Sequence, residues 1–173
     1  MNNDNFILLI GESGSGKTSV ANELYNKYGL SQVISYTTRE KRTSNEDCHI
    51  FISDDEFDEL EDLVAYTEYN GNRYGATAQQ VEENYVYVID PDGVDFFMEA
   101  YHGNKIPIVV YISVPEETRC CRLISRDGMY NAMERIKYDR KAFANAEIMA
   151  DVIVENENLS DCVDEIYRIW KHG

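Results

Sequence analysis

The segment Gly11-Glu12-Ser13-Gly14-Ser15-Gly16-Lys17-Thr18 constrains the fold of this chain most strongly. It matches the Walker A pattern of a Gly, any four residues, and then Gly-Lys-Ser/Thr. The apolar run from Phe6 to Ile10 comes directly before it and is typical of a buried strand. Apolar residues then recur at helical spacing from Val20 to Tyr28, and Gly29 is placed to end that helix. A strand, a glycine-rich loop and a helix in this order predict a phosphate-binding loop.

Each part of this loop has an expected role. Glycines let backbone N–H groups turn toward an anion, and the helix N-terminus adds positive potential. We expect Lys17 to reach the terminal phosphates of a nucleoside triphosphate and the Thr18 hydroxyl to bind Mg²⁺. Further phosphate contacts are expected from Gly11, Ser13, Gly14, Ser15 and Gly16. The competing interpretation, a chance glycine turn before a helix, is disfavoured by the flanking strand and helix.

Composition restricts the possible partners. The chain has 173 residues, which predicts one domain, and its formal net charge is −16. Nucleic acids and anionic membranes both require basic surfaces, so neither is expected as a partner. Seven carboxylates lie between Asp54 and Asp62, and we interpret them as a solvated helix face rather than a metal site. Four cysteines without ligand spacing, and no leader-like segment, predict a cytoplasmic protein with reduced thiols.

The order of apolar strands and amphipathic helices predicts an α/β fold with a parallel sheet and helices on both faces. The phosphate loop would then lie at the carboxyl edge of that sheet, where such sheets bind ligands. A polar, strand-rich segment from Ser35 to Tyr74 interrupts the alternation. We therefore expect this segment to form an insert over the mouth of the site.

Two further groups of residues carry chemistry. The apolar segment Tyr85 to Ile89 ends in Asp90, the Walker B arrangement in which an acid binds the metal directly or through water. A carboxylate at a strand end is often only a helix cap, so this pattern is weak alone. Arg39 and Arg42 are three residues apart and could both face one dianion, since Arg suits bidentate contact with phosphate oxygens. The alternative for these arginines is a solvated loop whose charges are balanced by neighbouring glutamates.

With these residues identified, the chain resembles the guanylate kinase family along nearly its whole length. The resemblance depends on the Walker A loop and on several further blocks, which are Ser35-Tyr36-Thr37-Thr38-Arg39 with Arg42, Gly71-Asn72-Arg73-Tyr74-Gly75, Ile89-Asp90-Pro91-Asp92-Gly93, Arg122 with Arg126, Arg135, and Asp151-Val152-Ile153-Val154. The Thr-Thr-Arg and Gly-Asn-x-Tyr-Gly blocks in this order are quite specific to this family among small P-loop kinases.

The resemblance implies a three-layer P-loop NTPase fold with a nucleoside-monophosphate (NMP)-binding insert and a helical lid. The core would comprise residues 1–33 and 75–173, the insert residues 34–74, and the lid about residues 125–138. By analogy with the family, Arg39, Arg42 and Tyr74 hold the acceptor phosphate, and Ser35 lies against the base. Asp90 is assigned to the NMP side as well as to the metal. The catalytic cations would be Lys17, Arg39, Arg126 and Arg135, the last two acting from the lid.

Several positions depart from the family pattern, and most concern the base. A glutamate that reads the guanine edge aligns with Ala65, and a Ser or Thr that helps bind the base aligns with Ala76. Losing such groups should relax base selection. Glu68 or Glu46 could substitute from a neighbouring position. Other expected residues, a Tyr, an acid and a Pro, are replaced by His49, Val88 and Lys41, and the loop from Thr43 to Cys48 is about two residues short.

The sequence therefore predicts an enzyme that transfers a phosphoryl group from ATP, with Mg²⁺, to an NMP, with GMP or dGMP expected and a monomer or homodimer as the assembly. Three alternatives stay open. The acceptor could carry another base, as Ala65 and Ala76 would allow. It could be a small molecule that is not a nucleotide, although the Ser35 to Arg42 block argues against this. The chain could also be an inactive guanylate-kinase-like interaction module, although its phosphate loop is complete.

Overall fold

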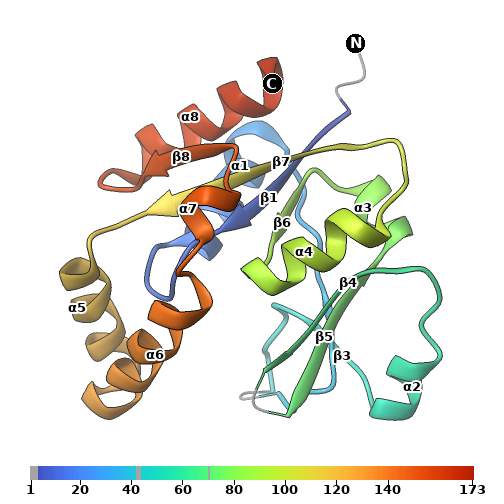
Figure 1. Cartoon of the computed structure of the whole chain (residues 1–173), viewed down its shortest axis with the longest axis horizontal. Coiled ribbons are helices and arrows are strands. Elements are labelled where there is room, and N and C mark those ends of the chain that lie inside the picture. Colours follow the sequence, from blue (N-terminus) through green and yellow to red (C-terminus); the bar gives the residue numbers. More distant parts are fainter. Residues whose placement is uncertain (1–3, 42–43, 70) are drawn as a thin grey trace.

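The structure, a computed structural model, describes residues 4–41, 44–69 and 71–173 (Figure 1). Its main element is a parallel sheet in the order β6 (Val86–Val88), β1 (Asn5–Ile10), β7 (Ile106–Ser113) and β8 (Val152–Glu155). Every residue of β1 is buried, since this strand lies between β6 and β7 and helices cover both of its faces. Such strands are nearly continuous in apolar residues, which explains why β1 stands out in the sequence.

Alternate side chains of β1 enter two different cores. Ile7 and Leu9 pack in a cluster with side chains of α1 (Lys17–Tyr28) and α8 (Leu159–His172). Phe6, Leu8 and Ile10 pack in a second cluster with side chains of α4 (Pro91–Ala100) and Ala146 of α7 (Ala146–Met149). The sheet is therefore the middle of three layers, which confirms the predicted α/β architecture.

A second sheet lies beside the first. Its order is β3 (Ile50–Phe51), β2 (Tyr36–Thr37), β5 (Asn72–Thr77) and β4 (Leu63–Tyr69). β4 and β5 form an antiparallel pair, and β4 packs against α4. Two short helices with complete capping boxes flank this sheet: α2 (Asp54–Asp58), capped by Ser53, and α3 (Ala78–Glu83), capped by Thr77.

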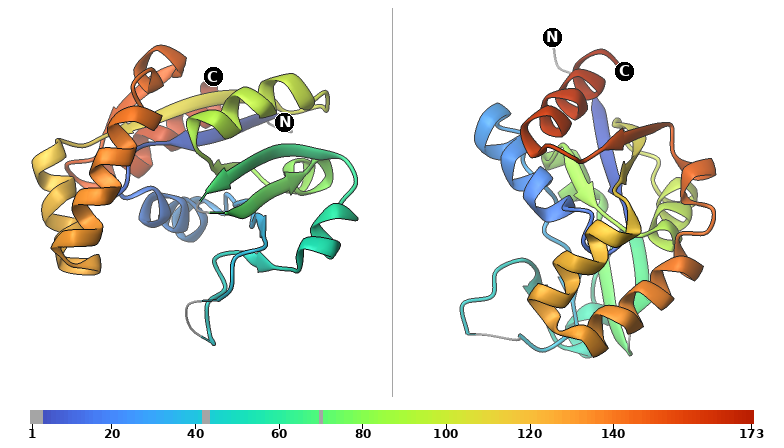
Figure 2. Two further views of the ribbon diagram at one scale, coloured as in Figure 1. Left: turned by 60° about the horizontal axis from the view of Figure 1, so that its bottom comes forward. Right: turned by 90° about the vertical axis from the view of Figure 1, so that its left-hand side faces the viewer.

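Two helices extend from the end of β7 on the other side of the phosphate loop. These helices, α5 (Glu116–Asp127) and α6 (Met129–Ala142), are separated by Gly128 and pack on each other through the small cluster of Leu123, Ala132 and Ile136. Figure 2 shows this helix pair and the second sheet on opposite sides of the chain's centre. The phosphate loop lies between them.

The connections between these elements are short. After α1, the segment 31–35 pairs with the main sheet through a bridge between Gln32 and Val86. After α6 ends at Ala142, α7 follows as a separate turn. Asp92 and Gly93 lie inside α4, because the Asp90 side chain accepts the Gly93 N–H and Pro91 occupies the first turn. No helix among the described residues is long and apolar enough to cross a membrane.

Candidate active site

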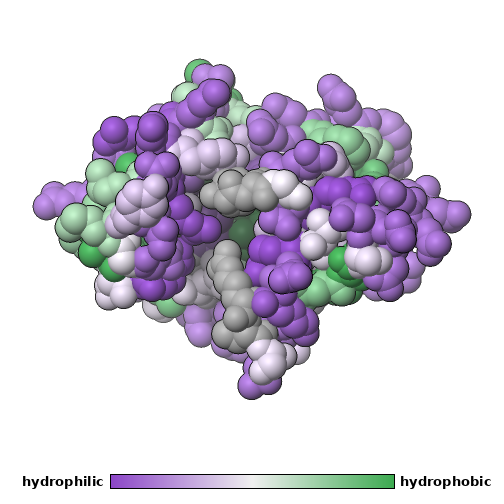
Figure 3. All heavy atoms as spheres, turned by 90° about the horizontal axis from the view of Figure 1, so that it is seen from below, coloured by the Kyte–Doolittle hydropathy of each residue, from purple (hydrophilic) through white to green (hydrophobic). Residues whose placement is uncertain are grey.

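A cavity of about 670 Å³ lies where the phosphate loop, the second sheet and the α5–α6 pair meet. Figure 3 shows a depression at the centre of a mostly hydrophilic face. Most of the predicted phosphate, acceptor and lid residues line this cavity: Gly11, Ser13, Gly14, Gly16, Lys17, Thr18, Ser35, Tyr74, Asp90, Arg126 and Arg135. Residues that are far apart in the sequence therefore face one volume, which is large enough for a sizeable ligand.

The phosphate loop requires glycine at two positions in particular. Gly14 and Gly16 have φ values of +82° and +94°, in the left-handed region that other residues rarely adopt. A Cβ atom on Gly14 would also lie only 3.0 Å from the Arg119 carbonyl oxygen, and one on Gly16 would lie 2.6 Å from Asn156 Nδ2. Gly16 is the N-cap of α1, so the loop leads directly into the N-terminus of that helix.

Lys17 lies folded against its own loop. Its ammonium group donates hydrogen bonds to the carbonyl oxygens of Gly11 and, at 3.2 Å, Glu12. Burial lowers the pKa of Lys17 to about 8, and the nearby carboxylates of Asp139 and Glu12 partly oppose this shift. A buried ammonium close to such a loop is poised to gain from an incoming phosphate anion.

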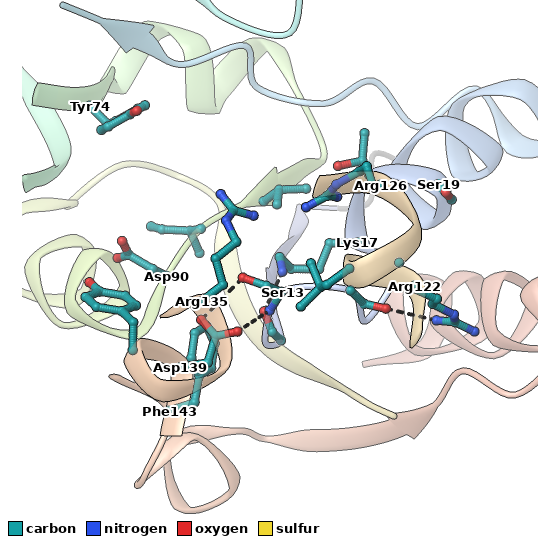
Figure 4. Close-up of a pocket in the computed structure, with 18 of the residues that line it drawn as sticks. Ser13, Lys17, Ser19, Tyr74, Asp90, Arg122, Arg126, Arg135, Asp139 and Phe143 are labelled. Carbon is teal, nitrogen blue, oxygen red and sulfur yellow. Dashed lines mark hydrogen bonds between the residues drawn. The ribbon is translucent and has the colours of Figure 1, made fainter. Parts of the chain in front are cut away.

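Side chains from distant elements hold the loop in place. Arg122 of α5 donates to the Gly14 carbonyl at 3.0 Å, and Asn156 donates to the Ser15 carbonyl at 2.8 Å. Asp139 of α6 accepts the Ser13 N–H at 2.7 Å, as drawn in Figure 4. Ser15 itself is fully buried and does not line the cavity, and its hydroxyl has no hydrogen-bond partner among the described residues.

On the second-sheet side of the cavity, polar groups form a small network. Ser35 Oγ lies 2.9 Å from His49 Nδ1, and the His49 ring packs edge-on against Tyr74 with 5.5 Å between ring centroids. Burial raises the pKa of Tyr87, with a hydrogen bond to Ser35 partly opposing it. The part of the site that contains Ser35 therefore also contains the imidazole of His49 and the phenol of Tyr87.

Asp90 lies between the two halves of the site. Its Oδ1 accepts the Gly93 N–H at 2.7 Å, and its Oδ2 accepts the Thr67 hydroxyl at 3.1 Å. Burial raises the pKa of this carboxyl group, and these two hydrogen bonds partly oppose the shift. Asp90 thus caps α4, as the alternative interpretation predicted, and it also lines the cavity, while its binding to a metal remains a prediction.

The predicted arginines occupy different environments. Arg135 points from α6 into the cavity, toward the region between Asp90 and Lys17 (Figure 4). Arg126 also lines the cavity and pairs with its neighbour Asp127 at 2.8 Å. Arg39 does not line the cavity; it makes a two-pronged ion pair with Glu46, the closer contact being 2.6 Å. Arg42 lies outside the described residues.

The alanines at the expected base-reading positions are adjacent and buried. Ala65 and Ala76 are cross-strand partners in the β4–β5 pair, with exposed fractions of 2% and 0%. Side chains alternate along a strand, so Ala65 and Thr67 share one face of β4 and Glu68 belongs to the other. Glu68 accepts a hydrogen bond from Tyr66, while Glu46 is paired with Arg39. Neither glutamate supplies a carboxylate to the cavity.

Several cavity residues had not been identified from the sequence. Thr67 and Tyr87 come from strands and carried no motif, and Asp139 lies in a helix rich in charged residues. Arg122 was recognised only as part of the family resemblance. The period-two pattern of β4 placed Thr67 on the same face as Ala65, which was the one available signal for it.

The residues present fit a magnesium ion held mainly by a nucleotide. Thr18 and Asp90, the two predicted metal residues, line the same cavity. Within the described ranges there is no group of three or more His, Cys, Asp or Glu side chains that could hold a metal alone. Mg²⁺ commonly takes one or two protein oxygens and completes its shell with waters and substrate phosphates. A site with few protein ligands matches that chemistry.

Comparison with known proteins places this geometry in a family. The family model described as "Guanylate kinase" matches residues 3–172. A guanylate kinase from Bartonella henselae is 28% identical across 94% of this chain and 78% of its own length. A guanylate kinase from Trichodesmium erythraeum is 34% identical across 49% of this chain and 48% of its own length.

A solved structure supports the fold. The crystal structure of guanylate kinase from Anaplasma phagocytophilum superposes with a TM-score of 0.65 at 23% sequence identity, covering 99% of this chain and 87% of that one. The family model spans almost every residue, and the matched region includes the phosphate loop, the second sheet and the α5–α6 pair. The chain belongs to the guanylate kinase family.

Proposed function

We propose that this protein catalyses phosphoryl transfer from ATP to a nucleoside monophosphate, with GMP or dGMP as the acceptor. One observation carries the proposal: the Walker A loop, the arginines of the α5–α6 pair and the second-sheet residues Ser35 and Tyr74 line a single cavity. A phosphate donor and a phosphate acceptor could therefore meet within it. Membership of the guanylate kinase family supports the same reaction.

The proposed reaction does not require a strong general base. An oxygen of the acceptor phosphate forms a bond to the terminal phosphorus of ATP while the bond from that phosphorus to ADP breaks, giving ADP and a nucleoside diphosphate. The attacking oxygen is already anionic, so catalysis is positioning and charge neutralisation. We assign Lys17, Arg126 and Arg135 to neutralising charge around the transferred group.

The acceptor phosphate is assigned to Arg39, Arg42 and Tyr74. Arg39 is bound to Glu46 in the absence of substrate, so an acceptor phosphate would have to exchange with that carboxylate. The base is assigned to the side of the cavity lined by Ser35 and Asp90. Closure of the α5–α6 pair over both nucleotides would exclude the water that otherwise accepts the phosphoryl group.

Further assignments go with this reaction. Mg²⁺ would be held by the ATP phosphates with Thr18, and with Asp90 directly or through water, and it would supply charge neutralisation on the transferred phosphates. The protein would work in the cytoplasm as a monomer or homodimer, with nucleotides rather than nucleic acids or membranes as partners. The formal charge of −16 supports the exclusion of polyanions.

The second candidate is the same reaction on another base. It is favoured by Ala65 and Ala76, which are buried and present no hydrogen-bonding side chain at the positions expected to read guanine. The polar side chains that line this side of the cavity include Ser35, His49, Thr67, Tyr74, Tyr87 and Asp90. A site that has lost a carboxylate rejects other bases less strongly.

A coupled ADP-release assay with ATP, Mg²⁺ and a panel of acceptors tests both candidates. The panel contains GMP, dGMP, AMP, CMP, UMP, dTMP and IMP, and a control without acceptor measures ATP hydrolysis. Turnover dominated by GMP or dGMP is the expected result, and turnover dominated by another base supports the second candidate. No turnover with any acceptor, combined with ATP binding in a thermal-shift assay, would overturn the enzyme assignment in favour of an interaction module or a substrate that is not a nucleotide.

A further inference from the structure

Two of the four residues of the phosphate loop that the Walker A pattern leaves unspecified, Glu12 and Ser13, are each held by a charged side chain from outside the loop. Asp139 Oδ2 accepts the Ser13 N–H at 2.7 Å, and Asp139 Oδ1 accepts the Ser13 hydroxyl at 3.3 Å. Arg119 Nη2 contacts Glu12 Oε1 at 3.2 Å, and Tyr111 donates its hydroxyl to Glu12 Oε2 at 2.6 Å. The loop is therefore bound from α6, α5 and β7.

This network is buried, which makes its geometry costly to disturb. The side chains of Arg119 and Asp139 are only 5% and 6% exposed. Arg119 also donates from Nε to the Val114 carbonyl at 3.1 Å, and its Nη1 lies 3.9 Å from Asp139 Oδ2. Removing one member of a buried ion pair leaves the charge of the other member buried without a partner, which is strongly destabilising. These side chains therefore have little freedom to move independently.

The position of Asp139 on α6 connects this network to the lid side of the cavity. Arg135 lies four residues earlier on the same helix, so the two side chains are neighbours one turn apart. Asp139 contacts the loop that would hold the donor phosphates, and Arg135 points into the cavity (Figure 4). Fixing Asp139 to Ser13 therefore fixes where Arg135 meets the phosphates.

We propose that Asp139 is a positioning residue that fastens α6 to the phosphate loop through Ser13 and sets the approach of Arg135 to the transferred phosphoryl group. The assignment of Arg135 to that group rests on the proposed function. The attachment of α6 to the loop does not depend on the acceptor.

The test measures kcat and KM for ATP with the best acceptor, and ATP affinity by calorimetry with Mg²⁺ and without any acceptor, in wild type and in Asp139→Asn. Asn keeps one oxygen for the Ser13 N–H, but its amide nitrogen cannot accept the Ser13 hydroxyl. The expected result is a kcat about tenfold lower, with KM and affinity for ATP within about threefold of wild type, because Arg135 is misplaced only at the transferred group. Glu134→Gln, an exposed charge removal on the same helix, is the matched control and should follow wild type. A wild-type kcat in a folded Asp139→Asn protein would overturn the proposal, whereas a wild-type enzyme without turnover on any acceptor would overturn the proposed function.

The variant Asp139→Glu provides a second, independent test. It keeps the charge but moves the carboxylate by one methylene, so kcat should fall about tenfold with little change in KM for ATP. If Asp139→Asn does not fold, this variant still decides, because a wild-type kcat would show that the attachment to Ser13 is not required. Because the ATP-binding measurement needs no acceptor, its outcome does not depend on which nucleotide is phosphorylated.

Discussion

The main cationic side chains on the two sides of the cavity have different binding partners. On the donor side, Lys17 is bound by backbone carbonyl oxygens of its own loop, and the carboxylate of Asp139 is bound to the loop's Ser13. On the acceptor side, Arg39 is bound directly by the carboxylate of Glu46. An incoming phosphate therefore finds a ready cation on one side and a cation already neutralised on the other.

The surrounding structure differs in the same way. The phosphate loop is held by side chains from α5, α6, β7 and the segment after β8. The acceptor-side strands β2 and β3 are each only two residues long. The described residues that follow β2 and precede β3 form no helix or strand. The donor side is therefore preorganised for one ligand shape, and the acceptor side must rearrange to bind. The predictions below test this contrast.

The largest effect is expected from Lys17→Ala. This change removes the charge that meets the terminal phosphates, and removing one such group typically costs about a thousandfold in kcat. The measurement is the coupled assay with the best acceptor. Lys27→Ala is the matched control, because Lys27 lies at the exposed end of α1 and pairs with Asp164. Activity of Lys17→Ala within tenfold of wild type would remove this lysine from the proposed mechanism.

The contrast also explains what could be predicted from sequence. The strand, loop and helix of the donor side are contiguous from Phe6 to Tyr28, so their pattern is local and the prediction of this unit is confirmed. Asp139 is 126 residues from Ser13, and on α6 it is surrounded by charged residues such as Lys137 and Arg140. No feature of the local sequence distinguishes a buried carboxylate that binds the phosphate loop from a solvated one.

The acceptor side shows a second limit of prediction from the sequence. The absence of polar side chains at Ala65 and Ala76 could be predicted because it depends on residue type alone. The pairing of Arg39 with Glu46 and of Ser35 with His49 depends on how a loop closes. The roles predicted for Arg39, Arg42, Tyr74, Arg126 and Arg135 remain predictions, since they require a bound nucleotide.

A comparison of two glycines tests the rigidity of the donor loop. Gly14 and Gly71 have φ values of +82° and +73°, so an alanine at either position costs about 1–2 kcal/mol in backbone strain. A Cβ on Gly14 would have close neighbours in Arg119, whereas none of the described residues beyond its chain neighbours lies within 4 Å of a Cβ on Gly71. Gly14→Ala should therefore weaken ATP binding about 30-fold or more, since overpacking adds to the strain. Gly71→Ala should lower only the melting temperature, and equal ATP affinities in the two variants would contradict a rigid donor loop.

The pH dependence of binding separates the two halves. With a pKa of about 8, Lys17 is protonated below pH 8 and loses its charge above it. ATP affinity, or kcat/KM for ATP, should therefore fall about tenfold per pH unit above pH 8, because these quantities report the free enzyme. Acceptor affinity should not fall over the same range, because the Arg39 guanidinium stays charged and its pKa is raised further by Glu46. Parallel titration of both affinities would show that one group controls both sides.

The smallest effect is expected from Glu46→Gln. This change removes the carboxylate that competes with the acceptor phosphate for Arg39, while an amide of the same size can still accept a hydrogen bond. Exposed ion pairs are worth less than about 1 kcal/mol, and this pair is more buried, with both side chains 13% exposed. We therefore expect KM for the acceptor to fall about three- to fivefold while KM for ATP stays constant. Glu40→Gln, an exposed charge removal in the same segment, is the control. A rise in the acceptor KM of Glu46→Gln would mean that Glu46 orients Arg39 for the phosphate, and the acceptor side would then be preorganised like the donor side.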